Sequence, residues 1–193
     1  LLGGQGLIGL PSSKQPELTL FLAPDAVWKI ERPNGEVEVL SDGQIIECAG
    51  ERFRFCWPSN SATETLSLAQ DQVVPTLHFL VSSDEDFVEL TLEYGERRIP
   101  LGSRSHNYLM LTLARQLLAD RAANLAEGSC GWMDKDELAD GFKMTPQQVD
   151  GEVFRIRKHF TLHGLSESTT IIERRPRTKQ IRLGFAQLRI ERR

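Results

Sequence analysis

The chain has 193 residues, enough for one large domain or two small ones, and 40% of them are hydrophobic and 26% charged. These values are typical of a soluble globular protein. No apolar run approaches the roughly 18 residues that a membrane helix needs, so we expect no membrane contact.

Cysteine usage and the first residues bear on the compartment. Cys48, Cys56 and Cys130 show no CxxC spacing, which argues against a zinc site, and we interpret them as free thiols of a reducing environment. The start, LLGGQGLIGL, has neither a basic region nor a cleavage site, so no signal peptide is predicted. These features favour a cytoplasmic protein without metal or cofactor.

Charge is unevenly distributed along the chain. The net charge at pH 7 is −4, which by itself would not suggest nucleic acid. However, residues 1–100 carry seven Lys and Arg against sixteen Asp and Glu, whereas residues 101–193 carry sixteen against eleven. This asymmetry indicates an acidic module joined to a basic one.

Residues 1–57 have the pattern of a small all-β domain. Turn signals recur at Asn34-Gly35, Asp42-Gly43 and Gly50, and short β-forming runs lie around them, namely VWKIE, EVEVL, QIIECA and RFRFCW. Residues 58–73 are rich in Ser, Thr, Asn and Gln and are predicted to form a linker.

The pattern after the linker begins with strands and becomes helical. Residues 88–94 alternate apolar and polar side chains, and Gly95-Glu96 is expected to turn this strand back into residues 97–101. NYLMLTLARQLLAD then predicts a first helix, and GWMDKDELADGF predicts a second with Asp134 as its N-cap.

The third predicted helix has the clearest start. Thr145, Pro146 and Gln148 supply an N-cap, a proline at the first helical position and a reciprocal capping side chain. A single apolar stripe follows, at Val149, Val153, Ile156 and Phe160. The opposite face carries Gln147, Gly151, Phe154, Arg155 and Lys158, at about 100° per residue.

A basic β-hairpin follows this helix. IIERRPRTKQIRLG places Arg174, Arg175, Arg177 and Lys179 around a turn at Pro176, between apolar β-formers. Strands, three helices and a hairpin are the order of a winged helix, in which a helix enters the major groove and nearby cations contact phosphates.

VDGEVFRIRKHF resembles the recognition helix of the OmpR-type winged-helix transcription regulators, DKDELADGF their second helix and TIIERRPRTKQIRLG their wing. The resemblance covers residues 74–187 and leaves 188–193 as a C-terminal tail. It implies an α+β fold, a small all-β domain followed by a winged helix-turn-helix domain. It departs from the family at RRPRTKQ, where a GxGY-like wing is usual, and nothing in 1–72 resembles a receiver domain.

The resemblance implies a transcriptional regulator that binds duplex DNA. It assigns backbone contacts to Arg174, Arg175, Arg177 and Lys179, and base or phosphate contacts to Gln147, Arg155 and Lys158. Phe154 lies on the predicted DNA face, where it would contact a thymine methyl or pack on another protein.

The N-terminal part is similar to a forkhead-associated (FHA) domain in the order of its short strands and glycines. FHA domains bind phosphothreonine through an arginine after an Ile-Gly pair and a Ser-x-x-His pair. Leu10 stands at the arginine position here, and no Ser-x-x-His is present. A phosphate dianion needs cationic or forked donors, so we expect contact with a protein partner or self-association, without dependence on phosphate.

Other functions remain open alternatives. The chain could be an interaction module whose two domains contact proteins and not DNA, the basic hairpin could be merely solvated, or the acidic half could cover it in cis. No G-x-S-x-G, Walker A or H-E-x-x-H motif occurs, so no enzyme is predicted. His159 and His163 are spaced for a metal, but no nearby carboxylate or cysteine supports one.

Overall fold

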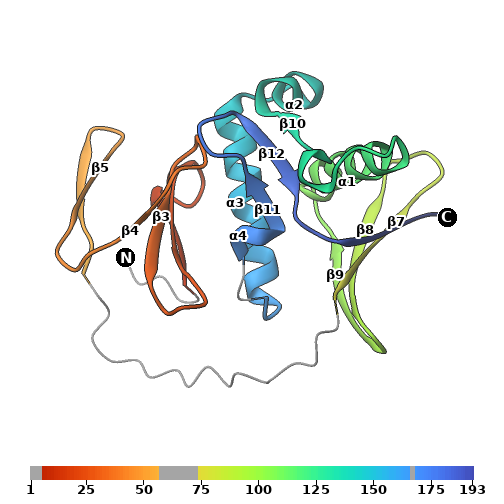
Figure 1. Cartoon of the computed structure of the whole chain (residues 1–193), viewed down its shortest axis with the longest axis horizontal. Coiled ribbons are helices and arrows are strands. Elements are labelled where there is room, and N and C mark those ends of the chain that lie inside the picture. Colours follow the sequence, from red (N-terminus) through yellow and green to blue (C-terminus); the bar gives the residue numbers. More distant parts are fainter. Residues whose placement is uncertain (1–5, 57–73, 166–167) are drawn as a thin grey trace.

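A computed structural model describes residues 6–56, 74–165 and 168–193 of the chain. The fold is α+β, with most strands gathered in two sheets that lie on opposite sides of the longest helix (Figure 1). The predicted linker, 58–73, lies outside the described residues. No helix within the described ranges is both long and apolar enough to cross a bilayer.

The N-terminal module, residues 6–56, is entirely β. Four antiparallel strands pair in the order β1-β2-β3-β4, and a separate hairpin, β5-β6, closes over their outer side. Its core contains Trp28, Ile30, Leu40 and Phe55. The strands are β1 (Leu7–Pro11), β2 (Pro16–Leu22), β3 (Trp28–Glu31), β4 (Val37–Val39), β5 (Ile45–Cys48) and β6 (Glu51–Arg54).

Strand β2 is buried on both of its faces. Successive strand side chains point to opposite sides, so Leu18 and Leu20 enter the core of the module while Phe21 points the other way. Phe21 is nevertheless buried, because helix α3 lies against that side of the sheet. The near-continuous apolar run of β2 is the sequence consequence of two covered faces.

The C-terminal domain, residues 74–193, opens with a second sheet, ordered β13-β7-β8-β9. The predicted hairpin at 88–101 is confirmed as β8 and β9, whereas the predicted C-terminal tail, 188–193, is wrong. That segment forms β13 and pairs parallel to β7, because its alternating Leu188 and Ile190 pack against the domain core. The strands are β7 (Thr76–Val81), β8 (Val88–Tyr94), β9 (Arg97–Ser103) and β13 (Gln187–Arg192).

Three helices follow β9, as predicted. Asp134 caps the second by accepting a hydrogen bond from Asp136 N, and Thr145 and Gln148 form the predicted capping box of the third. Lys143 ends α2 in a left-handed conformation. The helices are α1 (Asn107–Ala122), α2 (Lys135–Phe142) and α3 (Pro146–Leu162), with a 3₁₀ turn, η1 (Glu127–Ser129), after α1.

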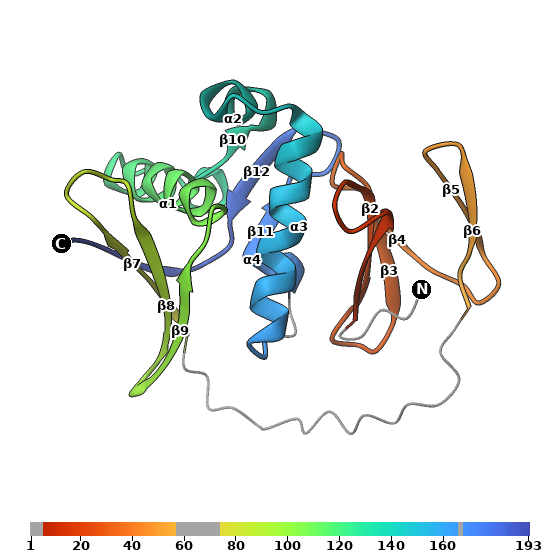
Figure 2. The ribbon, with the colours of Figure 1, turned by 180° about the vertical axis from the view of Figure 1, so that it is seen from behind.

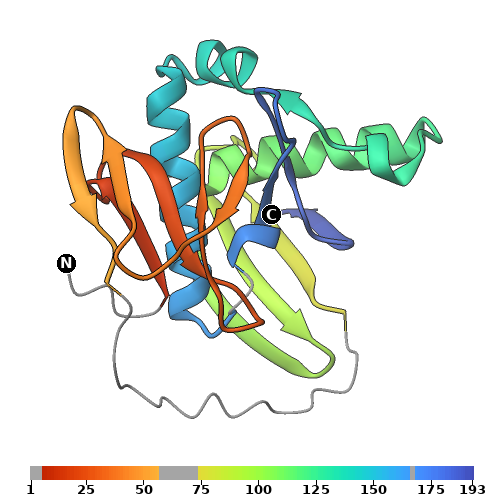
Figure 3. The same cartoon turned by 60° about the vertical axis from the view of Figure 1, so that its left-hand side comes forward.

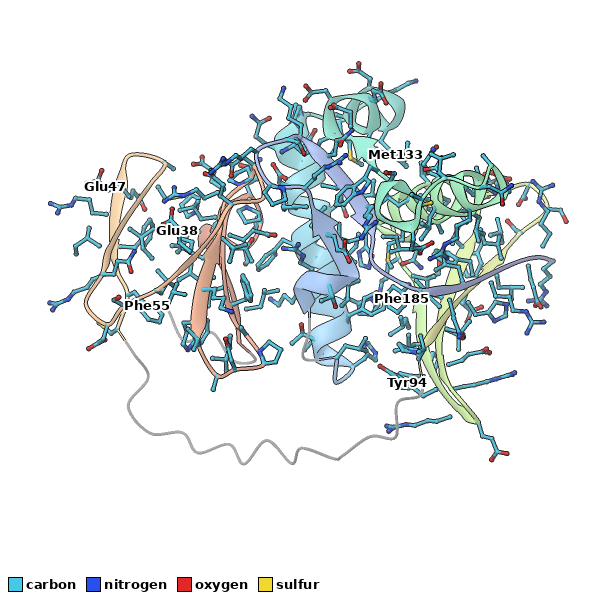
Figure 4. All side chains as sticks on the ribbon, viewed as in Figure 1. Glu38, Glu47, Phe55, Tyr94, Met133 and Phe185 are labelled. Carbon is cyan, nitrogen blue, oxygen red and sulfur yellow. The ribbon has the colours of Figure 1, made fainter. Side chains whose placement is uncertain are left out.

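A small antiparallel sheet, ordered β10-β12-β11, carries the basic hairpin. The first hairpin strand begins at Ile172, because Ser168–Ile171 forms a helical turn, α4, before β11. Phe185 lies just after β12 (Figure 4) and packs against Phe160 of α3, with tilted rings whose centroids are 5.8 Å apart, so it joins this sheet to the core. The strands are β10 (Met133–Asp134), β11 (Ile172–Arg174) and β12 (Gln180–Leu183).

Helix α3 lies between the two halves of the molecule. Figures 1 and 2 show it upright between the N-terminal sheet on one side and the sheet of the C-terminal domain on the other. Figure 3 shows the N-terminal sheet alongside α3 from a third direction. Both faces of α3 are therefore in contact with protein.

Phe160→Ala should destabilise the C-terminal domain by about 3–5 kcal/mol, because Phe160 is fully buried and truncation leaves a cavity. Leu162→Ala, on the same helix but 55% exposed, should change stability by no more than about 0.5 kcal/mol. Urea unfolding followed by circular dichroism measures both variants. Equal effects of the two substitutions would contradict the placement of α3.

Candidate nucleic-acid interface

The inner face of α3 is the predicted apolar stripe. Val149, Val153, Ile156 and Phe160 are all buried against α1, α2 and the two sheets of the C-terminal domain. A helix of 17 residues with this single stripe has an outer face available for another contact. What covers that outer face decides whether it is open to a ligand.

The N-terminal module covers the outer face of α3. Phe154, predicted to lie exposed toward DNA, is only 3% exposed and packs with Leu7, Phe21 and Ala23. The prediction of an exposed Phe154 is therefore wrong. Apolar burial of an aromatic ring stabilises the contact, which accounts for a phenylalanine on the outer side of the helix.

Two glycines permit this close approach. A Cβ atom on Gly9 would lie 3.1 Å from the ring of Phe154, and a Cβ atom on Gly151 would lie 3.3 Å from the carbonyl oxygen of Lys14. Glycine within a helix destabilises it by roughly 1 kcal/mol relative to alanine, so its occurrence inside α3 needs a packing reason. The backbone of the N-terminal module supplies that reason.

A buried ion cluster joins the two parts beside Phe154. We use this name for five charged residues that are each at most 8% exposed in their side chains: Glu31, Lys135, Asp150, Arg157 and Arg174. Glu31, at the end of β3, is the one member from the N-terminal module. Its carboxylate binds the guanidinium group of Arg157 through both oxygens, with Nη2 to Oε1 at 3.2 Å.

The remaining contacts tie the cluster to the C-terminal domain. Arg174 Nε lies 3.3 Å from Glu31 Oε2, and its Nη1 donates to Asp150 Oδ1 at 2.6 Å. Asp150 also accepts a hydrogen bond from Lys135 Nζ at 2.9 Å. Burial raises the pKa of Glu31, but Arg157 and Arg174 outweigh it, so the pKa stays below its ordinary value and Glu31 remains ionised.

The expectation that Arg174 lies exposed at the hairpin turn is wrong. Its side chain is 6% exposed, and Nη1 also donates to the carbonyl oxygen of Pro33 at 3.1 Å. Arg174 is the last residue of β11, and its side chain points toward α3 and Glu31. The hypothesis that the acidic half covers basic residues in cis agrees with this contact.

The other three hairpin cations are exposed. They belong to the basic tip, residues 175–179, which connects β11 to β12. Arg175 lies over the Trp132 ring, 5.5 Å from its centroid, and Lys179 Nζ lies 2.5 Å from Asp136 Oδ2. Arg177 is 85% exposed, and its backbone N–H donates to Asn34 O in the N-terminal module.

The predicted helix residues are exposed but do not all lie beside the basic tip. Gln147 is on the first turn of α3, and it lines a cavity of about 570 Å³ that Lys179 lines as well. Arg155 pairs with Glu152. Arg155 and Lys158 follow Gln147 by eight and eleven residues on the same helix. At about 1.5 Å per residue, this separates them from Gln147 by about 12 and 16.5 Å along the helix axis. The structure therefore brings together Gln147 and the basic tip, and places Arg155 and Lys158 elsewhere.

Three histidines meet where α1 begins beside the last turns of α3. His106 Nε2 lies 3.3 Å from His159 Nδ1, and the rings of His159 and His163 are 4.8 Å apart. Burial, followed by the nearby charges of His159, Arg104 and Arg155, lowers the pKa of His106 to about 4. Among the residues that the structure describes, no group of three or more ligands is arranged to hold a metal ion.

Sequence reasoning missed the buried ion cluster. Arg157 stands on the flank of α3, one residue after Ile156 of the apolar stripe, and Glu31 ends a strand whose neighbours are apolar. Charged side chains inside apolar segments are the signal that could have indicated buried pairing. This signal does not identify the residue that pairs with each charge, because Glu31 and Arg157 are 126 positions apart in the sequence.

Comparisons with known proteins add no relative. No family model matches the chain, and neither the curated proteins nor the solved structures contain a significant match.

Acidification should destabilise the protein through His106. Its pKa is lowered on folding, so the stability that its neutral form contributes is present above the ordinary value of 6.5 and is lost as the pH falls toward 4. His106→Gln cannot titrate and should flatten that part of the curve. Urea unfolding from pH 7 to pH 4 measures the slope. A variant as pH-sensitive as the parent would contradict this assignment.

Proposed function

We propose that this chain is a DNA-binding transcriptional regulator and that residues 74–187 adopt an OmpR-type winged helix. The order of elements supports the proposal: a sheet, three helices and a two-stranded hairpin. The short strand β10, between α1 and α2, pairs with β12 and extends the hairpin into a three-stranded sheet, β10-β12-β11.

The observation that carries the proposal is the basic tip beside the start of α3. Arg175, Arg177 and Lys179 are exposed there, and Gln147 is exposed on the neighbouring helical turn. Cations of this kind contact the phosphates of a duplex, while an amide side chain can bond to base edges. Side chains that lie close together on two rigid elements could contact one groove of a duplex and the phosphates beside it.

The conformation described here exposes only part of that surface. Strands β1 and β2 lie against Phe154 and Gly151, which are at the middle of α3. A duplex could contact the basic tip, but α3 could not enter a groove along its length while the N-terminal module is in place. Interfaces between domains of one chain generally resemble transient ones, so movement of the module is a reasonable step before full binding.

The N-terminal module is proposed to be FHA-like without a phosphothreonine site. Leu10, at the position of the family's arginine, is 2% exposed and packs inside the core of the module. An apolar buried side chain cannot bind a phosphate dianion. On this interpretation the module binds protein, and α3 is its partner in the present conformation.

A protein-interaction module that never binds DNA is the second candidate. Phe154 and Arg174 favour it, because both are already engaged by protein groups. The exposed arginines of the basic tip favour DNA, because the acidic residue paired with Arg177 leaves it 85% exposed. Affinity for a random duplex, and its dependence on salt, separates the two candidates.

Replacing Arg175 and Arg177 together with alanine should weaken binding to all DNA sequences alike. Loss of two phosphate contacts should reduce the slope of log affinity against log salt by about 1.8, at about 0.9 per contact. Fluorescence anisotropy with a random-sequence duplex at several salt concentrations measures this.

The matched control replaces Arg97 and Arg98, two exposed arginines at the start of β9, which lies at the other end of the domain (Figure 1). This pair changes the net charge equally and should leave the slope nearly unchanged. Equal losses in both variants would count against the basic tip. Absence of binding by the parent protein at low salt would favour the second candidate.

A further inference from the structure

The buried ion cluster is incomplete without the N-terminal module. Elements of the C-terminal domain contribute Lys135 from α2, Asp150 and Arg157 from α3, and Arg174 from β11. These four residues are three cations and one carboxylate. Glu31, the fifth member of the cluster, comes from the N-terminal module. The domain by itself therefore has a net positive site beside the outer face of α3.

Glu31 occupies that site in the manner of a bound oxyanion. Both of its oxygens are engaged by the fork of Arg157, and Arg174 Nε approaches the same Oε2 that Arg157 Nη1 contacts. The planar guanidinium fork binds carboxylates and phosphates in the same bidentate way. A phosphodiester group has two free oxygens that could take the places of Oε1 and Oε2.

We infer that Arg157 and Arg174 form a phosphate-binding site for the nucleic-acid backbone, which Glu31 fills as an intramolecular substitute while the N-terminal module covers α3. The inference rests on the proposed function, and it identifies the contact that regulates the same surface. The basic tip is then the part of the interface that is always exposed, and the Arg157–Arg174 site is the part that opens.

The energetics of buried ion pairs make such an exchange feasible. Removing charges from water offsets much of the attraction between Glu31 and its arginines, whereas leaving the buried arginines without an anion is strongly unfavourable. Replacing Glu31 by a phosphate that satisfies the same donors then exchanges one desolvated anion for another. Apparent DNA affinity equals the affinity of the open form reduced by the fraction of molecules that are open.

The apolar contacts explain why the N-terminal module packs on the outer face of α3. Phe154 fits between the strands of the module only because Gly9 leaves room for its ring. A larger side chain at Gly9 would meet the Phe154 ring and also Pro16 Cβ, which lies 3.0 Å from the added Cβ, so it would push the module away from α3 and press on β2 without altering any charge. Its backbone is not in the left-handed region that favours glycine, so the substitution is compatible with a strand.

Glu31→Gln should release the N-terminal module from α3 and raise affinity for a random-sequence duplex by about tenfold or more, because Arg157 and Arg174 lose the carboxylate that they share and the open fraction rises. Glu38→Gln is the matched control. It removes the same charge from β4, the next strand of the sheet (Figure 4), where Glu38 is exposed and pairs with Arg32. Hydrogen exchange of β1, β2 and α3 measures opening independently of DNA.

Two further variants keep the test decisive. Gly9→Leu should reproduce the gain without a charge change, which matters if Glu31→Gln folds poorly. Adding Arg174→Gln to the opened protein should reverse the gain and reduce the salt slope by about 0.9. Adding Arg189→Gln, whose side chain is exposed on β13, should not.

The outcomes distinguish this inference from the proposed function. If the parent binds DNA through the basic tip but Glu31→Gln and Gly9→Leu bind no more tightly, the inference is overturned and the proposed function stands. If Glu38→Gln gives the same gain as Glu31→Gln, a general charge effect replaces the inference. If exchange shows opening but no variant binds DNA, the proposed function fails together with the phosphate site.

Discussion

A single carboxylate between two buried guanidinium groups holds the described arrangement together. Glu31 carries the charge that allows Arg157 and Arg174 to be buried on the outer side of α3, and the pair in turn directs β3 toward that helix. A lone buried charge is strongly disfavoured, so each member constrains the others. The apolar packing of Phe154 with Leu7, Phe21 and Ala23 is a second contact between the same two parts.

The two faces of α3 pack against different parts of the protein. One stripe of the helix completes the core of the C-terminal domain, and the opposite stripe meets the N-terminal module through Phe154 and Gly151. Arg155 and Lys158 remain exposed on the same outer half of the helix as Phe154 and Gly151. A helix that is covered on both sides presents little of itself to a ligand, so the position of the module determines what α3 can bind.

The uneven charge of the chain has a structural counterpart at this junction. The acidic half supplies one buried carboxylate to a cluster in which the basic half has excess positive charge. The cluster receives this one carboxylate, and at the basic tip Glu36 of the acidic half pairs with Arg177 but leaves it 85% exposed. On the proposed function, a duplex would meet these exposed cations before the covered face of the helix.

The sequence by itself determined the features that depend on neighbouring residues. The capping box of Thr145 and Gln148, the cap at Asp134, the apolar stripe of α3 and the hairpin from 88 were all predicted, because caps and periodic burial are local properties. The sequence did not determine β13, whose short alternation at Leu188 and Ile190 has no local signal of a parallel partner. Nor did it determine the burial of Phe154 and Arg174. Only the tertiary structure decided these, because their partners, Phe21 and Glu31, lie more than a hundred residues away and no local pattern specifies which distant strand will meet a given helix.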